Sequence, residues 1–128
     1  MTKSEKKDTS NIQPVFDRVI AAANVAKENK GHDIVVLDLR EATRLFDYFL
    51  FVSGSSRRQL LTIGDEIKRK LVGEMGDTCL GSAGFTDAKW IVYDYGDIVV
   101  HLFEPETRAY YAIEELWGKA AKINWETQ

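Results

Sequence analysis

The sequence predicts a single α/β domain, with a mixed, twisted sheet of about five strands and flanking helices. Three observations predict this class. The chain has 128 residues, close to the usual length of one domain, and its hydrophobic fraction of 45% suffices for one core. A helical pattern between two strand patterns requires a parallel strand pair. A short, glycine-containing link between the last two strand patterns predicts an antiparallel hairpin.

The first helix is predicted over residues 14–30, after a polar, charged segment, 1–11, that is expected to be a disordered leader. Pro14 suits the first turn of a helix, where its missing N–H has no intrahelical partner to lose, and Gly31 is a natural stop. Apolar residues recur at spacings of three and four and give one apolar face. They are Phe16, Val19, Ile20, Ala23 and Ala26.

Two strands and a second helix follow. The runs 34–39 and 48–52 are rich in β-branched and aromatic residues with little polar alternation, which is typical of strands covered on both faces. Residues 53–56 then provide a glycine turn and serine hydroxyls that can cap a helix. That helix is expected to end near Gly73 and Gly76. Its predicted buried face consists of Leu60, Ile63, Ile67 and Leu71.

The second half is predicted to contain a short strand, two longer strands joined by a tight turn, a helix and a tail. These elements span residues 78–80, 90–93, 98–103, 106–117 and 119–128. The link 94–97 has the length and the glycine of a hairpin turn, and Pro105 stops the last strand. The folded domain is therefore expected to comprise residues 12–118.

Composition excludes several classes of protein. Cys79 is the only cysteine, so neither an intrachain disulfide nor a cysteine-based zinc site can form, and a reducing, cytoplasmic setting is expected. No apolar run approaches the roughly 20 residues of a membrane span. The net charge of −3 and the pI near 5.4 disfavour binding of nucleic acid through its phosphates. The expected partner is therefore a protein, with little or no sequence-specific binding of nucleic acid and no membrane.

The turn at residues 53–58 is the first candidate for chemistry. Its glycine, serines and arginines at a helix N-terminus could hold a phosphate. Alternatively the serines cap the helix and the arginines are solvated, which we favour because no Walker lysine and no glycines at dinucleotide spacing are present. A Gly-Ser turn also occurs in nucleotidyltransferases. However, no Asp-x-Asp pair lies on a predicted strand to hold their two magnesium ions.

Asp94, Asp97 and His101 are the second candidate, as a metal-binding or acid–base group. Strand alternation would place Asp97 and His101 on one face. The alternative, which we favour, is that both aspartates shape the turn and that the histidine is buried and hydrogen-bonded. The sequence therefore predicts no catalytic set, no metal site and no cofactor, and the chain is expected not to be an enzyme.

Aromatic residues concentrate in the last third of the chain, where they predict core or interface positions. Trp90 opens a predicted strand with Val92 on its own face and Ile91 on the other. Part of the Trp90 ring is therefore expected to stay exposed at the margin of the sheet. Tyr95 lies at the hairpin tip and is expected to be the least buried of the group. The other members are Tyr93, Tyr110, Tyr111 and Trp117.

Two stretches of the chain resemble the ribosomal silencing factor family, also called Iojap-like. The first comprises residues 36–39 (VLDL), 47–49 (DYF) and 53–57 (SGSSR). The second and more distinctive one runs from Trp90 to His101 (WIVYDYGDIVVH) and continues at residues 110–111 and 115–117. The resemblance covers about residues 12–118. The chain departs from the family pattern at Phe46, where threonine is common, and in the loop 81–88.

This resemblance implies a translational repressor rather than an enzyme. The family binds the fourteenth protein of the large ribosomal subunit at the face that the small subunit joins, and thereby lowers translation when nutrients are limiting. One alternative is a large-subunit assembly factor at the same site. Another is a nucleotidyltransferase-like enzyme with unusual ligands. The fold implied is nucleotidyltransferase-like in topology, without the catalytic carboxylates.

The resemblance also implies which residues contact the partner, by motif match or by proximity to the motif. They are Trp90, Asp94, Tyr95, Gly96, Asp97 and Glu104. Of these, Tyr95 and Glu104 rest on proximity alone. Because ribosomal proteins tend to be basic, acidic groups beside the hairpin would meet lysines and arginines across the interface. An exposed apolar docking surface also predicts a weak homodimer in the free protein.

Overall fold

The computed structural model describes residues 9–111, 115, 118 and 120–126. Most of the predicted leader and parts of the predicted last helix and tail lie outside these residues. The elements in chain order are α1 (Val15–Glu28), β1 (His32–Asp38), β2 (Tyr48–Ser53), α2 (Arg57–Lys68), the π-helical η2 (Arg69–Glu74), β3 (Gly81–Ala83), β4 (Trp90–Asp94), β5 (Ile98–Phe103), α3 (Pro105–Tyr111) and β6 (Ala121–Ile123).

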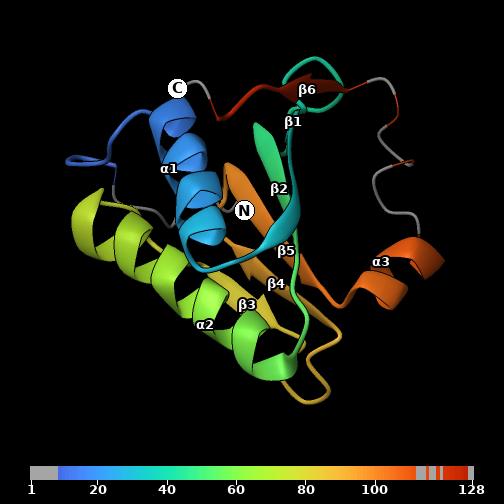
Figure 1. Ribbon diagram of the computed structural model, residues 1–128. Helices are drawn as coiled ribbons and strands as arrows, with labels where there is room; N and C mark the ends of the chain where they lie inside the picture. Colours follow the sequence, from blue (N-terminus) through green and yellow to red (C-terminus); the bar gives the residue numbers. More distant parts are fainter. Residues whose placement is uncertain (1–8, 112–114, 116–117, 119, 127–128) are drawn as a thin grey trace.

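One mixed sheet of six strands forms the centre of the described fold (Figure 1). Its strand order is β3-β4-β5-β2-β1-β6. The β2–β5 pair is parallel, with Tyr48 opposite Ile98, and the other pairs of described strands are antiparallel. The predicted parallel pair and the predicted hairpin are therefore confirmed. Every residue of β2 and β5 is buried, as expected for central strands without polar alternation.

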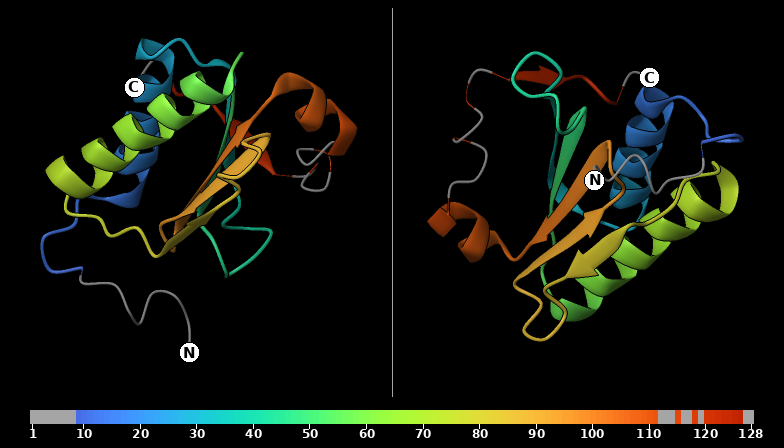
Figure 2. Two further views of the ribbon diagram at one scale, coloured as in Figure 1. Left: turned by 90° about the horizontal axis from the view of Figure 1, so that it is seen from below. Right: turned by 180° about the vertical axis from the view of Figure 1, so that it is seen from behind.

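The two faces of the sheet are both apolar. The helices α1 and α2 cover one face, and α3 lies on the other side of the sheet (Figure 2). Because side chains alternate along a strand, β1, β2 and β5 contribute to a core on each face. The main core, under α1 and α2, includes Val36, Leu50, Val100 and Leu102. The second core, on the opposite face, contains Leu37, Leu39, Phe49, Phe51, Val99 and Phe103.

Local signals explain where the two long helices begin and end. The Ser56 hydroxyl accepts a hydrogen bond from the Gln59 N–H at 3.1 Å, which confirms the predicted cap of α2. After α1, Lys30 has a φ of 67°, and the Gly31 N–H donates to the Ala26 carbonyl at 2.8 Å. The predicted buried face of the second helix is also confirmed, since Leu60, Ile63, Ile67 and Leu71 are all buried.

The second half differs from its prediction in two places. The sequence predicts a short strand at residues 78–80, but β3 comprises Gly81–Ala83 and pairs with β4. The sequence predicts a tail after residue 118, but β6 pairs with β1, and the buried Trp125 donates from its indole N–H to the Ile34 carbonyl at 3.1 Å. Strands of three residues are too short to show a period of two. Of the predicted last helix, residues 106–117, the structure describes residues 106–111, which belong to α3, and Glu115.

Candidate docking surface

The turn of the β4–β5 hairpin is shaped by Asp94 and Gly96. The Asp94 carboxylate accepts a hydrogen bond from the Gly96 N–H at 2.8 Å. Gly96 has a φ of 91°, a conformation that a side chain would strain. The Tyr95 N–H donates to the Ile98 carbonyl at 2.9 Å and closes the turn. The prediction that Asp94 shapes this turn is therefore confirmed.

Asp97 is held by a buried arginine of α1. Arg18 is 2% exposed, binds both carboxylate oxygens of Asp97 at 3.0 and 2.6 Å, and binds Asp77 at 2.6 Å. Burial lowers the pKa of Arg18, but the hydrogen bonds and charges of Asp97 and Asp77 raise it overall. Sequence reasoning missed this group. The available signal was an arginine at helical spacing from Ala22 and Ala26, on the buried side of α1.

The expectation that Asp97 and His101 share one face is wrong. β5 begins at Ile98, so strand alternation does not extend back to Asp97, whose carboxylate binds α1 instead. The His101 ring packs on the opposite face, with its centroid 4.8 Å from that of Phe49 and 5.1 Å from that of Phe51. Within the described residues, no group of three or more histidine, cysteine, aspartate or glutamate side chains could hold a metal ion.

His101 and Trp90 form a hydrogen-bonded aromatic pair. His101 is buried, and its Nδ1 accepts a hydrogen bond from the Trp90 indole N–H at 3.2 Å, so the predicted buried, hydrogen-bonded histidine is confirmed. Burial lowers the pKa of His101 to about 4. The neutral ring, accepting at Nδ1, must carry its proton on Nε2. The Trp90 ring also stacks on Phe103, with centroids 5.3 Å apart.

Trp90 is partly exposed, as its position at the start of β4 predicts. Trp90 and Val92 pack against the second core, while Ile91 and Tyr93 lie in the main core, which confirms the predicted alternation. The backbone of the loop before β4 packs closely against the first residue of that strand. Gly84 has a φ of 94°, and a Cβ there would lie 2.1 Å from the Trp90 carbonyl oxygen. The close approach of Gly84 to Trp90 therefore fixes the backbone at the start of β4.

Tyr95 and Glu104 complete the set of predicted contact residues. Tyr95 is fully buried in the main core, so the expectation that it is the least buried aromatic residue is wrong. Its ring turns inward because an aromatic side chain gains most by burial, and this burial raises the pKa of its hydroxyl group. Glu104 follows β5, where its N–H donates to the Lys89 carbonyl at 2.9 Å.

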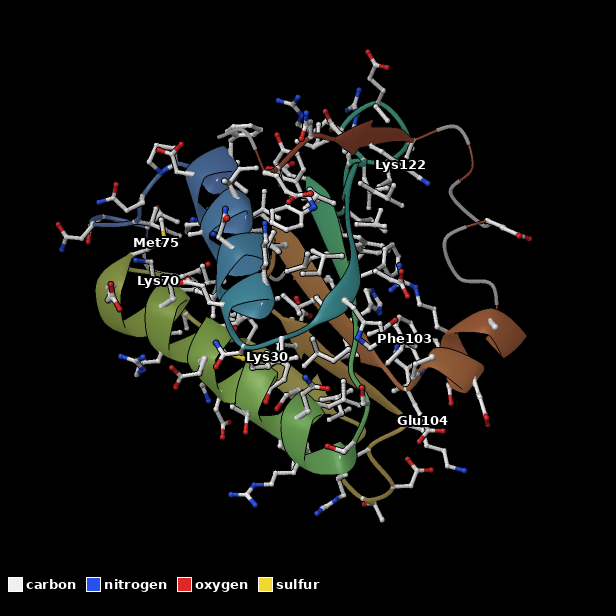
Figure 3. The ribbon with its side chains drawn as sticks, in the orientation of Figure 1. Lys30, Lys70, Met75, Phe103, Glu104 and Lys122 are labelled. Atoms are coloured by element: carbon white, nitrogen blue, oxygen red, sulfur yellow. The ribbon has the colours of Figure 1, made fainter. Side chains whose placement is uncertain are left out.

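The predicted contact residues therefore lie in two places. The turn 94–97 is at one end of the hairpin, and Trp90 is at the other, since Trp90 pairs with Phe103. Glu104 belongs to the Trp90 end, where β5 leads into α3 (Figure 3). A strand of six residues separates the two ends, which corresponds to about 20 Å.

Charged residues of the loop that joins β1 to β2 also lie at the turn end of the hairpin. The Asp97 carbonyl accepts hydrogen bonds from the N–H groups of Asp47 and Tyr48, at 2.8 and 3.1 Å. Arg40 donates two hydrogen bonds to the Asp38 carboxylate, at 2.9 and 2.7 Å, and thereby lowers its pKa. Burial, and then the charge of Asp97, raises the pKa of Asp47. At this end of the sheet, Asp38 and Asp97 are therefore paired with arginines, and Asp47 is a carboxyl group whose charged form its surroundings disfavour.

The turn at residues 53–58 has contacts that fit its capping role better than phosphate binding. Ser56 caps α2. Ser53 is buried, and its hydroxyl accepts a hydrogen bond from Arg108 at 2.8 Å. Arg57 donates to the Phe85 carbonyl at 3.2 Å. These groups hold α3 and the loop before β4 against the sheet.

The mixed sheet and the hairpin define a small α/β domain whose candidate residues are held in fixed geometry by hydrogen bonds. The chain belongs to the family described as "Ribosomal silencing factor during starvation" (RsfS), whose model matches residues 12–128. This match extends beyond residue 118 and includes β6. No helix among the described residues is long and apolar enough to cross a membrane.

Named relatives and a solved structure are similar to this chain. A Bacillus subtilis protein named "Ribosomal silencing factor RsfS" is 38% identical over 99 residues, which cover 77% of this chain and 83% of that protein. "Protein Iojap, chloroplastic" of Zea mays is 32% identical, over 81% of this chain and 45% of that protein. A crystal structure of a Chromobacterium violaceum protein is 34% identical with a TM-score of 0.79, and the match covers 83% of this chain and 88% of that one.

Proposed function

We propose that this protein binds the large ribosomal subunit through its fourteenth protein, in the cytoplasm, and sterically blocks joining of the small subunit. The result is lower translation when nutrients are limiting. The observation that carries this proposal is the match of residues 12–128 to a family described by ribosomal silencing during starvation. The function is one of binding, and the hydrogen-bonded hairpin supplies the rigid surface that tight docking requires.

Trp90 is the docking anchor in this proposal. Its ring is partly exposed, and its backbone is fixed by the loop at Gly84. Its indole N–H already donates to His101, so the contact with the partner is made by the ring rather than by a hydrogen bond. Tryptophan is among the residues that carry most of the binding energy in interfaces. Glu104, at the same end, adds a charge at the rim of the contact.

The turn 94–97 contributes shape in this proposal. Asp94 and Gly96 set its backbone, and the buried Tyr95 ring fastens it to the core. The Asp97 side chain is 28% exposed while bound to Arg18, so a basic partner meets an acid that is already fixed in place.

Sedimentation tests the proposal. The purified protein should pellet with isolated large subunits and not with small subunits, and it should lower the yield of joined ribosomes in proportion to its occupancy. Equal loading onto small subunits, or an unchanged yield of joined ribosomes at saturating protein, would contradict it. Binding restricted to immature large subunits, with joining unaffected, would favour the assembly role instead.

We also propose that the free protein forms a weak homodimer through the surface that otherwise meets the ribosome. Analytical ultracentrifugation over a wide concentration range should show a mass that rises with concentration. A constant monomer mass at the highest concentration would contradict this proposal.

A further inference from the structure

The loop between β1 and β2 displays a large apolar side chain to solvent. Leu45 is 75% exposed, and Val72, the other large hydrophobic residue exposed in the described part of the chain, is 38% exposed. The loop itself is ordered by internal contacts. The Leu45 N–H donates to the Thr43 hydroxyl at 3.1 Å, and the ring of the next residue, Phe46, lies 5.3 Å from that of Phe49. The fold therefore holds Leu45 outward.

Asp47 places a half-buried carboxylate two residues after this leucine. Its N–H donates to the Asp97 carbonyl at 2.8 Å, which fixes its backbone against the hairpin turn. Burial, and then the charge of Asp97, raises the pKa of its carboxyl group, with a smaller contribution from Asp38. Arg40 and Arg18 offset this only in part, and no described group forms a hydrogen bond or ion pair with this carboxylate.

The exposed Leu45 side chain and the half-buried Asp47 carboxylate complement one kind of partner surface. An incoming lysine or arginine would stabilise the charged form of Asp47, which its own surroundings disfavour. An apolar pocket would remove Leu45 from water. Nucleic acid fits poorly, because the Asp47 carboxylate would repel phosphates, whereas Asp38 and Asp97 are already paired with Arg40 and Arg18. The complementary surface is thus a basic protein with an apolar pocket beside a cation.

We propose that Leu45 and Asp47 form a second docking contact, in which the leucine enters an apolar pocket and the carboxylate meets a lysine or arginine of a basic ribosomal protein. This contact rests on the proposed function, and it lies beside the hairpin turn, at the opposite end from Trp90. It also gives the Asp47 carboxylate a specific role in choosing the partner.

Matched variants test this contact. Leu45→Ser is compared with Val72→Ser, the second exposed hydrophobic residue, and Asp47→Asn with Asp65→Asn, an exposed aspartate of α2. Affinity for isolated large subunits is measured by co-sedimentation at two salt concentrations. Leu45→Ser should bind about tenfold more weakly. Asp47→Asn should bind several-fold more weakly and with less salt dependence, and both controls should bind like the wild type.

A second measurement does not depend on affinity. Cysteine is placed at position 45 or at position 72 in a Cys79→Ser background, and each thiol is labelled with a maleimide in the presence of saturating large subunits. Labelling should be suppressed about tenfold at position 45 and unchanged at position 72, as expected where only the first lies in an interface.

The outcomes separate this contact from the proposed function. If the wild type binds large subunits but Leu45→Ser and Asp47→Asn bind equally well, or if position 45 stays fully reactive, the second contact is overturned and the proposed function stands. If the wild type binds no large subunits, both are overturned. Loss of binding in the two variants, with protection at position 45, supports the contact.

Discussion

The two ends of the β4–β5 hairpin are built by different forces. At the turn end, charged groups hold the backbone: Arg18 binds Asp97 and Asp77, and Asp94 binds the Gly96 N–H. At the other end, aromatic rings pack together, and Trp90 keeps part of its ring in solvent. Residues of one sequence motif therefore have different roles at the two ends. Asp94 and Asp97 stabilise the turn, whereas Trp90 exposes part of its ring to solvent.

The largest effect on stability is expected from a substitution of Arg18, which binds the turn end of the hairpin. Arg18→Met removes the cation that binds both Asp97 and Asp77, so the two carboxylates lose their shared counter-charge. Breaking a buried ion pair on one side typically costs about 3–5 kcal/mol. Urea unfolding monitored by circular dichroism should show this loss. The double variant Arg18→Met with Asp77→Asn should recover part of it, and a single variant as stable as the wild type would contradict the structural role of this group.

The aromatic end is expected to respond to pH through His101. Its folded pKa of about 4 lies below the unfolded value of 6.5, so the unfolded chain binds the proton more readily. The stabilisation is fully present above pH 6.5 and is lost as the pH falls toward 4, by at most about 3 kcal/mol. Melting curves between pH 4 and 7.5 should show this slope. His101→Phe, which packs without titrating, should flatten it, and an equal slope in both proteins would contradict the assignment.

A substitution at Gly84 tests whether the loop before β4 holds the backbone of Trp90 in place. At Gly84 a Cβ would meet the Trp90 carbonyl oxygen in a left-handed conformation, so Gly84→Ala should cost about 2 kcal/mol of unfolding free energy. Gly81→Ala is the matched control, because no atom lies within 4 Å of a Cβ there. Thermal melting of both variants measures the difference. Equal melting temperatures would show that the loop does not constrain the start of β4.

Patterns of burial could be predicted from the sequence because they depend on local periodicity. The face of α2, the two covered strands and the half-exposed Trp90 all follow from the spacing of apolar residues. Contacts between distant residues could not be predicted in this way. Arg18 binds Asp97, which is 79 positions away in the sequence. The Tyr95 ring is buried in the main core, and the residues of that core come from distant parts of the chain. β6 was missed because three residues show no period, and its pairing with β1 decides its structure.

Two tryptophan variants, compared in large-subunit binding and in subunit joining, test whether Trp90 is the docking anchor. Trp90→Ala, at the partly exposed site, should remain folded but bind large subunits about thirtyfold more weakly, corresponding to about 2 kcal/mol. It should therefore fail to lower the yield of joined ribosomes at concentrations where the wild type does. Trp125→Ala, at the buried site, should melt earlier but bind normally while folded. If folded Trp90→Ala binds and blocks joining like the wild type, Trp90 is not the docking anchor, and the proposed docking through this end of the hairpin is contradicted.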